Sequence, residues 1–310
     1  MFCRDNPSVP VINMDALYYC ADTKNVESSI RESPGYRFVH LNLRDYEELV
    51  MFAKETRITH VVHFAAQSHV QSSFTDSLNY TQDNVVGTHN LLEAMRLHNP
   101  HLRKFIHVST DEVYGESMLG DGARRKTEQT VLCPTNPYAA TKAAAELVAQ
   151  SYHHSFRMPI IITRGNNVYG PNQYPEKVIP RFISQLREGN KVTIQGDGSC
   201  VRAFMHVSDA AKAFIVILQK GVVGEIYNIG CDEGMEHSIL DVAKRLIKLV
   251  KGARATTGDW IEYVPDRLFN DKRYYISNRK LKLLGWKQEV PFDLGLRFCT
   301  ERCPESSAHE

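Results

Sequence analysis

Short apolar, β-branched runs alternate with stretches of helical periodicity through the first half of the chain. The runs predict strands at Val9–Met14, Arg37–Leu41, His60–Phe64, Lys104–Ser109 and Pro159–Thr163. The intervening stretches predict helices at Asp45–Thr56, within Ser77–His98, and at Pro137–Tyr152, where alanine is abundant. Strands and helices in alternation are typical of βαβ units, so we expect an α/β fold with a doubly wound parallel sheet.

The pattern changes after Gly165, where Gly, Asn, Pro and Tyr follow one another closely as far as Gln195. Beyond this stretch the sequence predicts a helix at Val207–Leu218, a strand at Glu225–Ile229, a helix at Ser238–Val250 and a strand at Trp260–Val264. We interpret residues 1–165 as one domain and residues 166–310 as a smaller α/β domain. Part of 200–230 is expected to return to the first domain.

Composition excludes several classes of protein. The 310 residues carry 37 Lys and Arg against 36 Asp and Glu, so we expect no nucleic-acid partner. The apolar runs are too short to span a membrane, and the N-terminus lacks the apolar segment of a signal peptide. Seven cysteines are scattered without a Cys-x-x-Cys pair, and the histidines lack metal-ligand spacing. We therefore expect a cytoplasmic protein with reduced thiols and no metal.

The sharpest local motif is Tyr138-x-x-x-Lys142 on a predicted helix. Residues four apart lie on the same helix face, so the ammonium can stabilise the phenolate. A free tyrosine has a pKa of about 10, and a neighbouring cation lowers it towards values useful for a general base. An amphipathic helix that carries both residue types by chance remains the alternative.

A hydroxyl and two carboxyl groups follow the predicted strand Lys104–Ser109 directly, at Thr110, Asp111 and Glu112. Sites in open α/β sheets form at the carboxyl ends of strands. Adjacent carboxyl groups can point in different directions and serve different protons. The alternative is a helix N-cap, because Thr and Asp are good capping residues.

Four segments carry a resemblance to a known family. They read STDEVYG, PTNPYAATKAAAE, RGNNVYGPNQYPEKVIPRFI and VPDRLFNDKRY. These segments resemble the nucleotide-sugar 4,6-dehydratases that act on dTDP-glucose or UDP-glucose, within the extended short-chain dehydrogenase/reductase group. The match runs from about Val9 to about Phe298. It implies a Rossmann-like NAD-binding domain, a nucleotide-sugar-binding domain, and a homodimer formed by the helices around Asn84–His98 and Pro137–Tyr152.

The resemblance also implies a mechanism for an NAD-dependent lyase. Tyr138, helped by Lys142, deprotonates the C4 hydroxyl while hydride leaves C4, and Thr110 lies near the C4 oxygen. Glu112 then removes the C5 proton and Asp111 protonates the departing C6 hydroxyl. Hydride returns to C6 and gives a 4-keto-6-deoxy sugar nucleotide, a precursor of rhamnose or another deoxysugar.

Binding residues follow from the same resemblance. The cofactor set is Asp15, Asn42, Ala65, Ala66, Ser68, Asn84, Tyr138, Lys142 and Asn167. The substrate set is His69, Thr110, Asn166, Lys177, Arg202, Asn228, Asp266, Arg267 and Asn270.

The sequence departs from the family at its beginning. Family members start with a strand and a Gly-x-x-Gly-x-x-Gly loop that binds the NAD pyrophosphate, and we find no such motif. We expect a fragment or truncated form, in which Val9–Met14 and His60–Phe64 lose the strand that would pair with both. Asn42 and Gln71 stand where the family usually has Asp.

Two other classes of function stay open from the sequence. An epimerase or reductase of the same fold would form a 4-keto intermediate without losing water. The Asp111–Glu112 pair argues against that class. A non-catalytic homologue would keep the pocket and act by binding, and the missing glycine loop argues for it.

Overall fold

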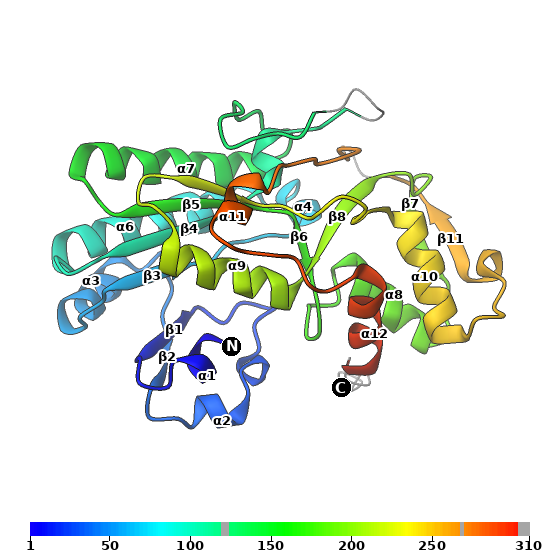
Figure 1. Ribbon diagram of the computed structural model, residues 1–310, viewed down its shortest axis with the longest axis horizontal. Helices are drawn as coiled ribbons and strands as arrows, with labels where there is room; N and C mark the ends of the chain where they lie inside the picture. The colour runs from blue at the N-terminus through cyan, green and yellow to red at the C-terminus, as the bar shows by residue number, and fades with distance from the viewer. Residues whose placement is uncertain (119–123, 267–269, 303–310) are drawn as a thin grey trace. The chain divides into compact units, whose positions relative to one another are not determined.

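The computed structural model describes residues 1–118, 124–266 and 270–302 (Figure 1). Contacts between residues divide the chain into two compact units. Unit 1 comprises Met1–Ser109, Pro137–Thr163 and Ile217–Ile226, and unit 2 comprises Thr110–Asn136, Arg164–Val216 and Tyr227–Glu310. Four of the boundaries fall inside elements, namely β4 (Lys104–Thr110), β5 (Ile160–Gly165), α9 (Val207–Lys220) and β9 (Ile226–Ile229), and the fifth lies directly before Pro137. The segment 110–136, which the sequence analysis assigns to the first domain, groups with unit 2.

Unit 1 carries two separate sheets. Strands β1 (Val11–Asp15) and β2 (Tyr36–His40) form a parallel pair. The second sheet has the order β3-β4-β5-β9, with β3 at His60–His63, β4 at Lys104–Thr110, β5 at Ile160–Gly165 and β9 at Ile226–Ile229. Within the described residues no ladder joins β1 to β3.

The helical elements that lie within unit 1 are α1 (Phe2–Asp5), η1 (Thr23–Asn25), α2 (Ser28–Arg31), α3 (Tyr46–Glu55), α4 (Val70–Ser73), α5 (Ser77–Thr81), η2 (Gln82–Val86), α6 (Gly87–His98) and α7 (Pro137–Phe156). Helices α3, α6 and α7 of unit 1 bury apolar side chains in the core that includes strands of the larger sheet. One core cluster joins Leu49 of α3, Leu92 of α6, Phe105 of β4 and Ala149 of α7. Asp45 caps α3, since its carboxylate accepts a hydrogen bond from the Glu48 amide at 3.1 Å.

The helix predicted within 77–98 is interrupted by η2, a π-helical turn. Asn84 lies in this turn, and both polar atoms of its side chain form hydrogen bonds with other parts of unit 1. Its Oδ1 accepts from the Gln67 amide at 2.7 Å, and its Nδ2 donates to the Gln67 carbonyl at 3.0 Å and to Thr141 Oγ1 at 2.9 Å. Short π-turns inside helices commonly mark functional sites. Here the turn brings an amide side chain between two other segments of unit 1.

Unit 2 has its own sheets and core. Its elements are η3 (Asp111–Tyr114), β6 (Asn167–Tyr169), α8 (Val178–Arg187), β7 (Val192–Gln195), β8 (Val201–His206), most of α9 (Val207–Lys220), β10 (Glu236–Ser238), α10 (Ile239–Lys251), η4 (Thr257–Trp260), β11 (Ile261–Val264), α11 (Arg279–Leu283) and α12 (Phe292–Arg302). The strand orders are β10-β8-β6 and β11-β7. Phe182, Ile194, Leu246 and Leu296 belong to one buried cluster.

Candidate active site

The carboxyl end of β4 continues directly into the 3-10 turn η3. Thr110 is the N-cap of this turn, because its Oγ1 accepts a hydrogen bond from the Glu112 amide at 3.3 Å. The capping role considered from the sequence is therefore present. The same turn presents Asp111 and Glu112 with different partners, so capping and acid–base chemistry coexist in one short segment.

Asp111 is buried in unit 2, with 2% of its surface exposed. Asn166 Nδ2 donates to its Oδ2 at 2.6 Å, and the Cys231 amide donates to Asn166 Oδ1 at 2.9 Å. Burial, and then the charge of Glu112, raise the pKa of Asp111 to about 7, although the Asn166 hydrogen bond acts in the opposite direction. Asp111 can therefore carry a proton near neutral pH.

Glu112 has a second set of partners in the same unit. Asn136 Nδ2 donates to its Oε2 at 3.0 Å, and the Tyr274 hydroxyl lies 3.3 Å from the same oxygen. Tyr274 also donates to Asp271 Oδ2 at 2.6 Å. Burial raises the pKa of Glu112, and the Asn136 hydrogen bond opposes that rise. The two neighbouring carboxyl groups therefore have separate hydrogen-bonding partners.

Three of these partners were missed by the sequence analysis: Asn136, Asp271 and Tyr274. Each lies inside a segment that carried the resemblance, so position in those segments was the only available signal. Thr135 Oγ1 adds a 2.6 Å hydrogen bond to Asp271 Oδ2. No spacing rule connects residues 112 and 274, which are brought together only by the fold of unit 2.

Tyr138 and Lys142 lie one turn apart in α7 of unit 1, and both are buried. Pro137 is the first residue of this helix, a position where the missing N–H of proline costs nothing. Thr141 donates to the Tyr138 carbonyl at 2.8 Å and accepts from Asn84, which ties this turn to η2. Burial lowers the pKa of Lys142 to about 8.

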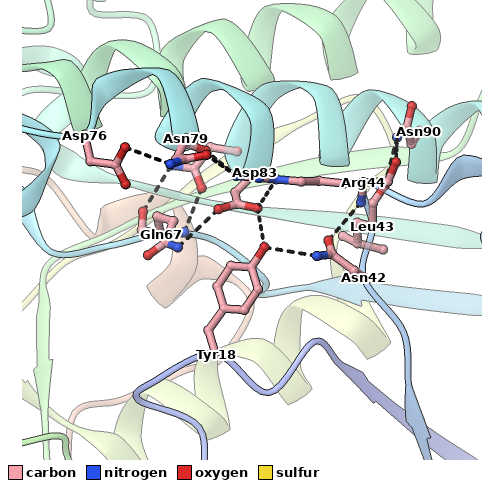
Figure 2. Close-up of polar contacts among 10 residues, drawn as sticks. Tyr18, Asn42, Leu43, Arg44, Gln67, Asp76, Asn79, Asp83 and Asn90 are labelled. Carbon is pink, nitrogen blue, oxygen red and sulfur yellow. Dashed lines mark hydrogen bonds and ion pairs between the residues drawn. The ribbon is translucent and has the colours of Figure 1, made fainter.

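A polar network follows β1 and β2 in unit 1, and Figure 2 shows it. Asn42 donates from Nδ2 to the Tyr18 hydroxyl at 3.0 Å and accepts from the Arg44 amide at 3.0 Å. Tyr18 donates to Asp83 at 2.9 Å, and Arg44 forms an ion pair with Asp83 at 2.7 Å. Both ends of the Asn42 amide are therefore engaged by the chain itself.

Asp15 stands apart from this network at the exposed end of β1. Its Oδ1 accepts from the Leu17 amide at 2.8 Å, and the residue is exposed. Ala65, Ala66 and Ser68 follow β3 in the segment that leads to α4. His69 of the predicted substrate set contacts Ser72 Oγ through Nδ1 at 2.8 Å.

The predicted substrate residues of unit 2 fall into two groups. Arg202, Asn270 and Asp266 form a chain of hydrogen bonds, with 3.1 Å from Arg202 to Asn270 and 3.1 Å from Asn270 to Asp266. The Arg202 guanidinium also lies over the Tyr274 ring, 4.8 Å from its centroid. These contacts place Arg202 next to the partners of Glu112.

The other predicted substrate residues are placed differently. Asn228 is fully buried, with its Oδ1 accepting from Tyr114 at 2.8 Å. Lys177 lies 3.5 Å from the Glu176 carboxylate. Asn167, which belongs to the predicted cofactor set, is exposed on β6. Arg267 lies outside the described residues.

The expected NAD cofactor fits the described residues at both of its ends. Asp15, exposed at the end of β1, would hold the hydroxyls of the adenosine ribose, and the buried Tyr138–Lys142 turn would hold the nicotinamide ribose. Between these ends, the described part of the chain has no glycine-rich turn from a strand into a helix of the kind that binds a pyrophosphate. The described residues contain no cluster that could hold a metal ion and no helix long and apolar enough to cross a membrane.

Known proteins resemble this chain over almost its whole length. A family model described as GDP-mannose 4,6 dehydratase matches residues 3–298. The dTDP-D-glucose 4,6-dehydratase of Bos taurus is 43% identical over 296 residues, covering 95% of this chain and 81% of that protein. The crystal structure of DesIV, a dTDP-glucose 4,6-dehydratase from Streptomyces venezuelae with NAD and TYD bound, has a TM-score of 0.87. It is 35% identical, and the match covers 96% of this chain and 88% of that one.

A multifunctional plant protein is similar over the same region. It is the trifunctional UDP-glucose 4,6-dehydratase/UDP-4-keto-6-deoxy-D-glucose 3,5-epimerase/UDP-4-keto-L-rhamnose-reductase RHM2 of Arabidopsis thaliana, 44% identical over 295 residues. The match covers 95% of this chain and 43% of that protein. The fold and the Tyr-x-x-x-Lys turn define an extended short-chain dehydrogenase/reductase. Within that class, the chain belongs to the GDP-mannose 4,6-dehydratase family.

Proposed function

We propose that this chain removes one water from dTDP-glucose or UDP-glucose, with NAD as cofactor, and forms the 4-keto-6-deoxy sugar nucleotide. The observation that carries the proposal is the pair of adjacent carboxyl groups with separate partners, Asp111 with Asn166 and Glu112 with Asn136. Dehydration across two neighbouring carbons needs an acid and a base side by side. The names of the similar proteins support the same reaction.

The first step takes place at C4 of the sugar. Bound NAD would supply hydride chemistry there, accepting hydride from C4 and returning it to C6. Tyr138 takes the proton of the C4 hydroxyl, and the Lys142 ammonium one turn away stabilises the phenolate that this requires. Thr110 offers a hydroxyl to the C4 oxygen.

The second step removes water across C5 and C6. Glu112 takes the C5 proton, which the C4 ketone makes acidic, while Asp111 gives its proton to the C6 oxygen that leaves as water. Glu112 then returns a proton to C5. The pKa of Asp111 at about 7 allows it to start protonated. The Asn136 donor favours the ionised form of Glu112 that a base needs.

After each turnover the protonation states of Tyr138 and Asp111 have to be restored. Tyr138 has gained the C4 hydroxyl proton, and Asp111 has lost a proton to the water that leaves. Glu112 is unchanged, since it removes and returns a proton at C5. A net proton must therefore leave Tyr138 and reach Asp111 through solvent before the next substrate reacts.

The binding residues that we propose come from both predicted sets. Asp15 binds the adenosine ribose, the segment with Ala65, Ala66 and Ser68 lines the cofactor, and Asn167 lies at the cofactor. Arg202, Lys177 and His69 bind the nucleotide sugar, with Arg202 suited to the diphosphate. Asp266 and Asn270, which hydrogen-bond to each other, bind the nucleotide end of the substrate.

Four predicted contact residues receive a supporting role instead. The side-chain amides of Asn42, Asn84, Asn166 and Asn228 are all engaged by protein partners. A satisfied buried amide shapes a site by holding other groups in place. Asn166 holds Asp111, and Asn84 holds the α7 turn that carries Tyr138.

We also propose a homodimer in the cytoplasm. Exposed apolar side chains on α6 and α7 support the dimer: Leu97 is 48% exposed, Leu147 is 60% exposed and Phe156 is 51% exposed. The cysteines that the structure describes are free thiols, which supports a reducing compartment. Sedimentation should show a dimer, and Leu147→Glu should shift it towards monomer.

Mass spectrometry tests the function directly. The chain is incubated with NAD and, in separate reactions, with dTDP-glucose and UDP-glucose. Loss of one water from either nucleotide sugar supports dehydration and identifies the base. Interconversion of epimers without a mass change would favour an epimerase. Binding without any chemical change would favour a non-catalytic homologue.

A further inference from the structure

The carboxylate of Asp83 connects three segments of unit 1 that each follow a strand (Figure 2). Asp83 belongs to the π-turn η2, and its side chain is 10% exposed. The Tyr18 hydroxyl donates to its Oδ1 at 2.9 Å, Arg44 Nε forms an ion pair with the same oxygen at 2.7 Å, and Gln67 Nε2 donates to its Oδ2 at 3.1 Å. Tyr18 follows β1, Arg44 follows β2 and Gln67 follows β3. One carboxylate therefore contacts the chain just beyond the carboxyl ends of three strands.

The Tyr18 hydroxyl joins the first two of these segments to each other. It has a single hydrogen, which it donates to Asp83, so it accepts a hydrogen bond from Asn42 Nδ2 at 3.0 Å. Burial, and then the hydrogen bond to Asp83, raise the pKa of Tyr18, so the hydroxyl keeps this hydrogen. An ionised carboxylate in place of the Asn42 amide could not donate to Tyr18 and would repel Asp83. The asparagine and the aspartate therefore fit together.

The pair of strands β1 and β2 needs such contacts, because in the described residues no ladder joins it to the larger sheet. Its apolar side chains are only partly buried against the core cluster of unit 1: Ile12, Met14 and Val39. Asn90 of α6 donates to the Leu43 carbonyl at 2.8 Å, which holds the segment after β2. Asp83 holds the segments after both strands, so the position of both strand ends depends on it.

These strand ends are where we place the adenosine end of NAD. Dinucleotides bind at the carboxyl ends of the strands in doubly wound sheets. Asp15, proposed for the adenosine ribose, is the last residue of β1 and lies three residues before Tyr18. The Leu17 amide between them donates to Asp15 Oδ1 at 2.8 Å, so the turn from the carboxylate to the Tyr18 ring is short and closed. A movement of Tyr18 would therefore move the carboxylate that holds the ribose.

The π-turn also contacts the segment proposed for the other end of the cofactor. Asn84 follows Asp83 in η2. Its side chain bonds the amide and the carbonyl of Gln67 and donates to Thr141 Oγ1 at 2.9 Å. Thr141 lies in the turn of α7 that carries Tyr138. Adjacent residues of one turn thus hold the segments proposed for the two ends of NAD.

We propose that Asp83 is a positioning residue for NAD, which fixes the carboxyl ends of β1 and β2, and with them Asp15, for the adenosine end of the cofactor. Asp83 acts through Tyr18 and Arg44. The inference rests on the proposed function for the identity of the cofactor, but the contacts of Asp83 do not. Without Asp83 its partners lose a shared acceptor, and the β1–β2 pair should separate from the rest of unit 1 more often.

Replacing Asp83 with alanine tests the proposal by two measurements on the full chain. The dissociation constant for NAD, measured by calorimetry, should rise about tenfold, because hydrogen bonds to a charged group have been lost and Asp15 is no longer held in one position. Amide hydrogen exchange in β1 and β2 without NAD should become about tenfold faster or more, and saturating NAD should restore protection. Tyr18→Phe, which loses only the hydroxyl, should show smaller changes of the same kind.

Glu93→Ala is the matched control. Glu93 of α6 accepts from the Tyr152 hydroxyl at 2.7 Å and from Arg96 Nε at 2.8 Å, so its carboxylate has the same kinds of partner as that of Asp83. Its contacts lie on α6 and α7, away from the ends of β1 and β2. Its loss should lower the stability of the chain and leave the dissociation constant for NAD unchanged, and exchange in β1 and β2 should not become faster than in the rest of unit 1.

The outcomes separate this inference from the proposed reaction. An equal dissociation constant for NAD in the wild type and Asp83→Ala, or an equal rise in Asp83→Ala and Glu93→Ala, would overturn the inference. A chain that binds NAD in this Asp83-dependent way but removes no water from dTDP-glucose or UDP-glucose would overturn the proposed function alone. A wild-type chain that binds no NAD would overturn both.

Discussion

Asn166 donates a hydrogen bond to the Asp111 carboxylate at 2.6 Å and accepts one from the Cys231 amide at 2.9 Å. The amide therefore joins the acidic group to the backbone that follows β9. It also moderates the proton affinity of Asp111, because a donor to a carboxylate favours the ionised form. Burial works in the opposite direction and dominates, which leaves the pKa near neutrality.

Replacing Asn166 with alanine should raise the pKa of Asp111 further. Without the donor, Asp111 keeps its proton to higher pH, so the alkaline limb of the rate profile should move upwards. The Cys231 amide loses its acceptor in the same variant, and stability should fall by about 1–3 kcal/mol. The checks are a pH–rate profile and urea unfolding.

Asn278→Ala provides the control for the Asn166 variant. Asn278 is a buried amide that donates to the Gly230 carbonyl at 3.0 Å and to Asp232 at 2.7 Å, and it has no bond to Asp111. Its loss should cost similar stability without moving the alkaline limb. An equal displacement of the limb in both variants would refute the specific link between Asn166 and Asp111.

Asp111 should make folding stability depend on pH in a characteristic way. Its pKa is about 7 in the folded protein and 3.8 in the absence of the fold, so the folded state retains the proton between these values. The resulting stabilisation is complete below pH 4 and is lost as the pH rises through 7. Asp111→Asn removes this dependence and should be more stable than the wild type at pH 8, by a few kcal/mol at most. The advantage should shrink at pH 5, and an advantage independent of pH would contradict the shift.

Glu112→Gln should separate oxidation from dehydration. The amide cannot remove the C5 proton, so water loss should slow by about 100-fold or more, while C4 oxidation continues. Reduced nicotinamide should therefore accumulate and can be followed by its absorbance. Product formation at the wild-type rate would exclude Glu112 as the base.

Tyr138→Phe should stop the reaction one step earlier. The ring remains and the hydroxyl is lost, so C4 oxidation should slow by about 100-fold or more while the packing of α7 is retained. Single-turnover absorbance should show no reduced nicotinamide. Normal formation of reduced nicotinamide in this variant would assign the C4 proton to another group.

The strands of unit 1 were predictable because each is an apolar run between turn residues. Predicted and observed limits differ by no more than two residues, as at Val9–Met14 against Val11–Asp15. The π-turn at Gln82–Val86 was not predictable from periodicity. It depends on Asn84 reaching Gln67 and Thr141, which lie in other segments of the chain.

Several elements of unit 2 were not predicted. Strands β7 and β8 are short and carry polar residues such as Thr193 and Arg202, which mask the apolar pattern. Helix α8 contains Pro180 in its first turn. Proline is tolerated at that position, but in a sequence it usually indicates the end of a helix, so the helix was not predicted.

The residues of the candidate site were likewise only partly predictable from the sequence. Local motifs indicated Tyr138, Lys142, Asp111 and Glu112, because the chemistry resides in residues close together in sequence. Tyr274 depends on a contact with Glu112 across more than half of the chain, and no local rule detects such a pair.

The most direct test of the proposed reaction follows a label within one molecule of substrate. The chain is supplied with NAD and with dTDP-glucose or UDP-glucose that carries deuterium at C4, and the product is analysed by mass and by NMR. The account predicts loss of one water with the deuterium retained and now at C6, because hydride leaves C4 and returns to C6 in the same site. A product that loses no water, or that loses water with the deuterium absent from C6, would contradict it.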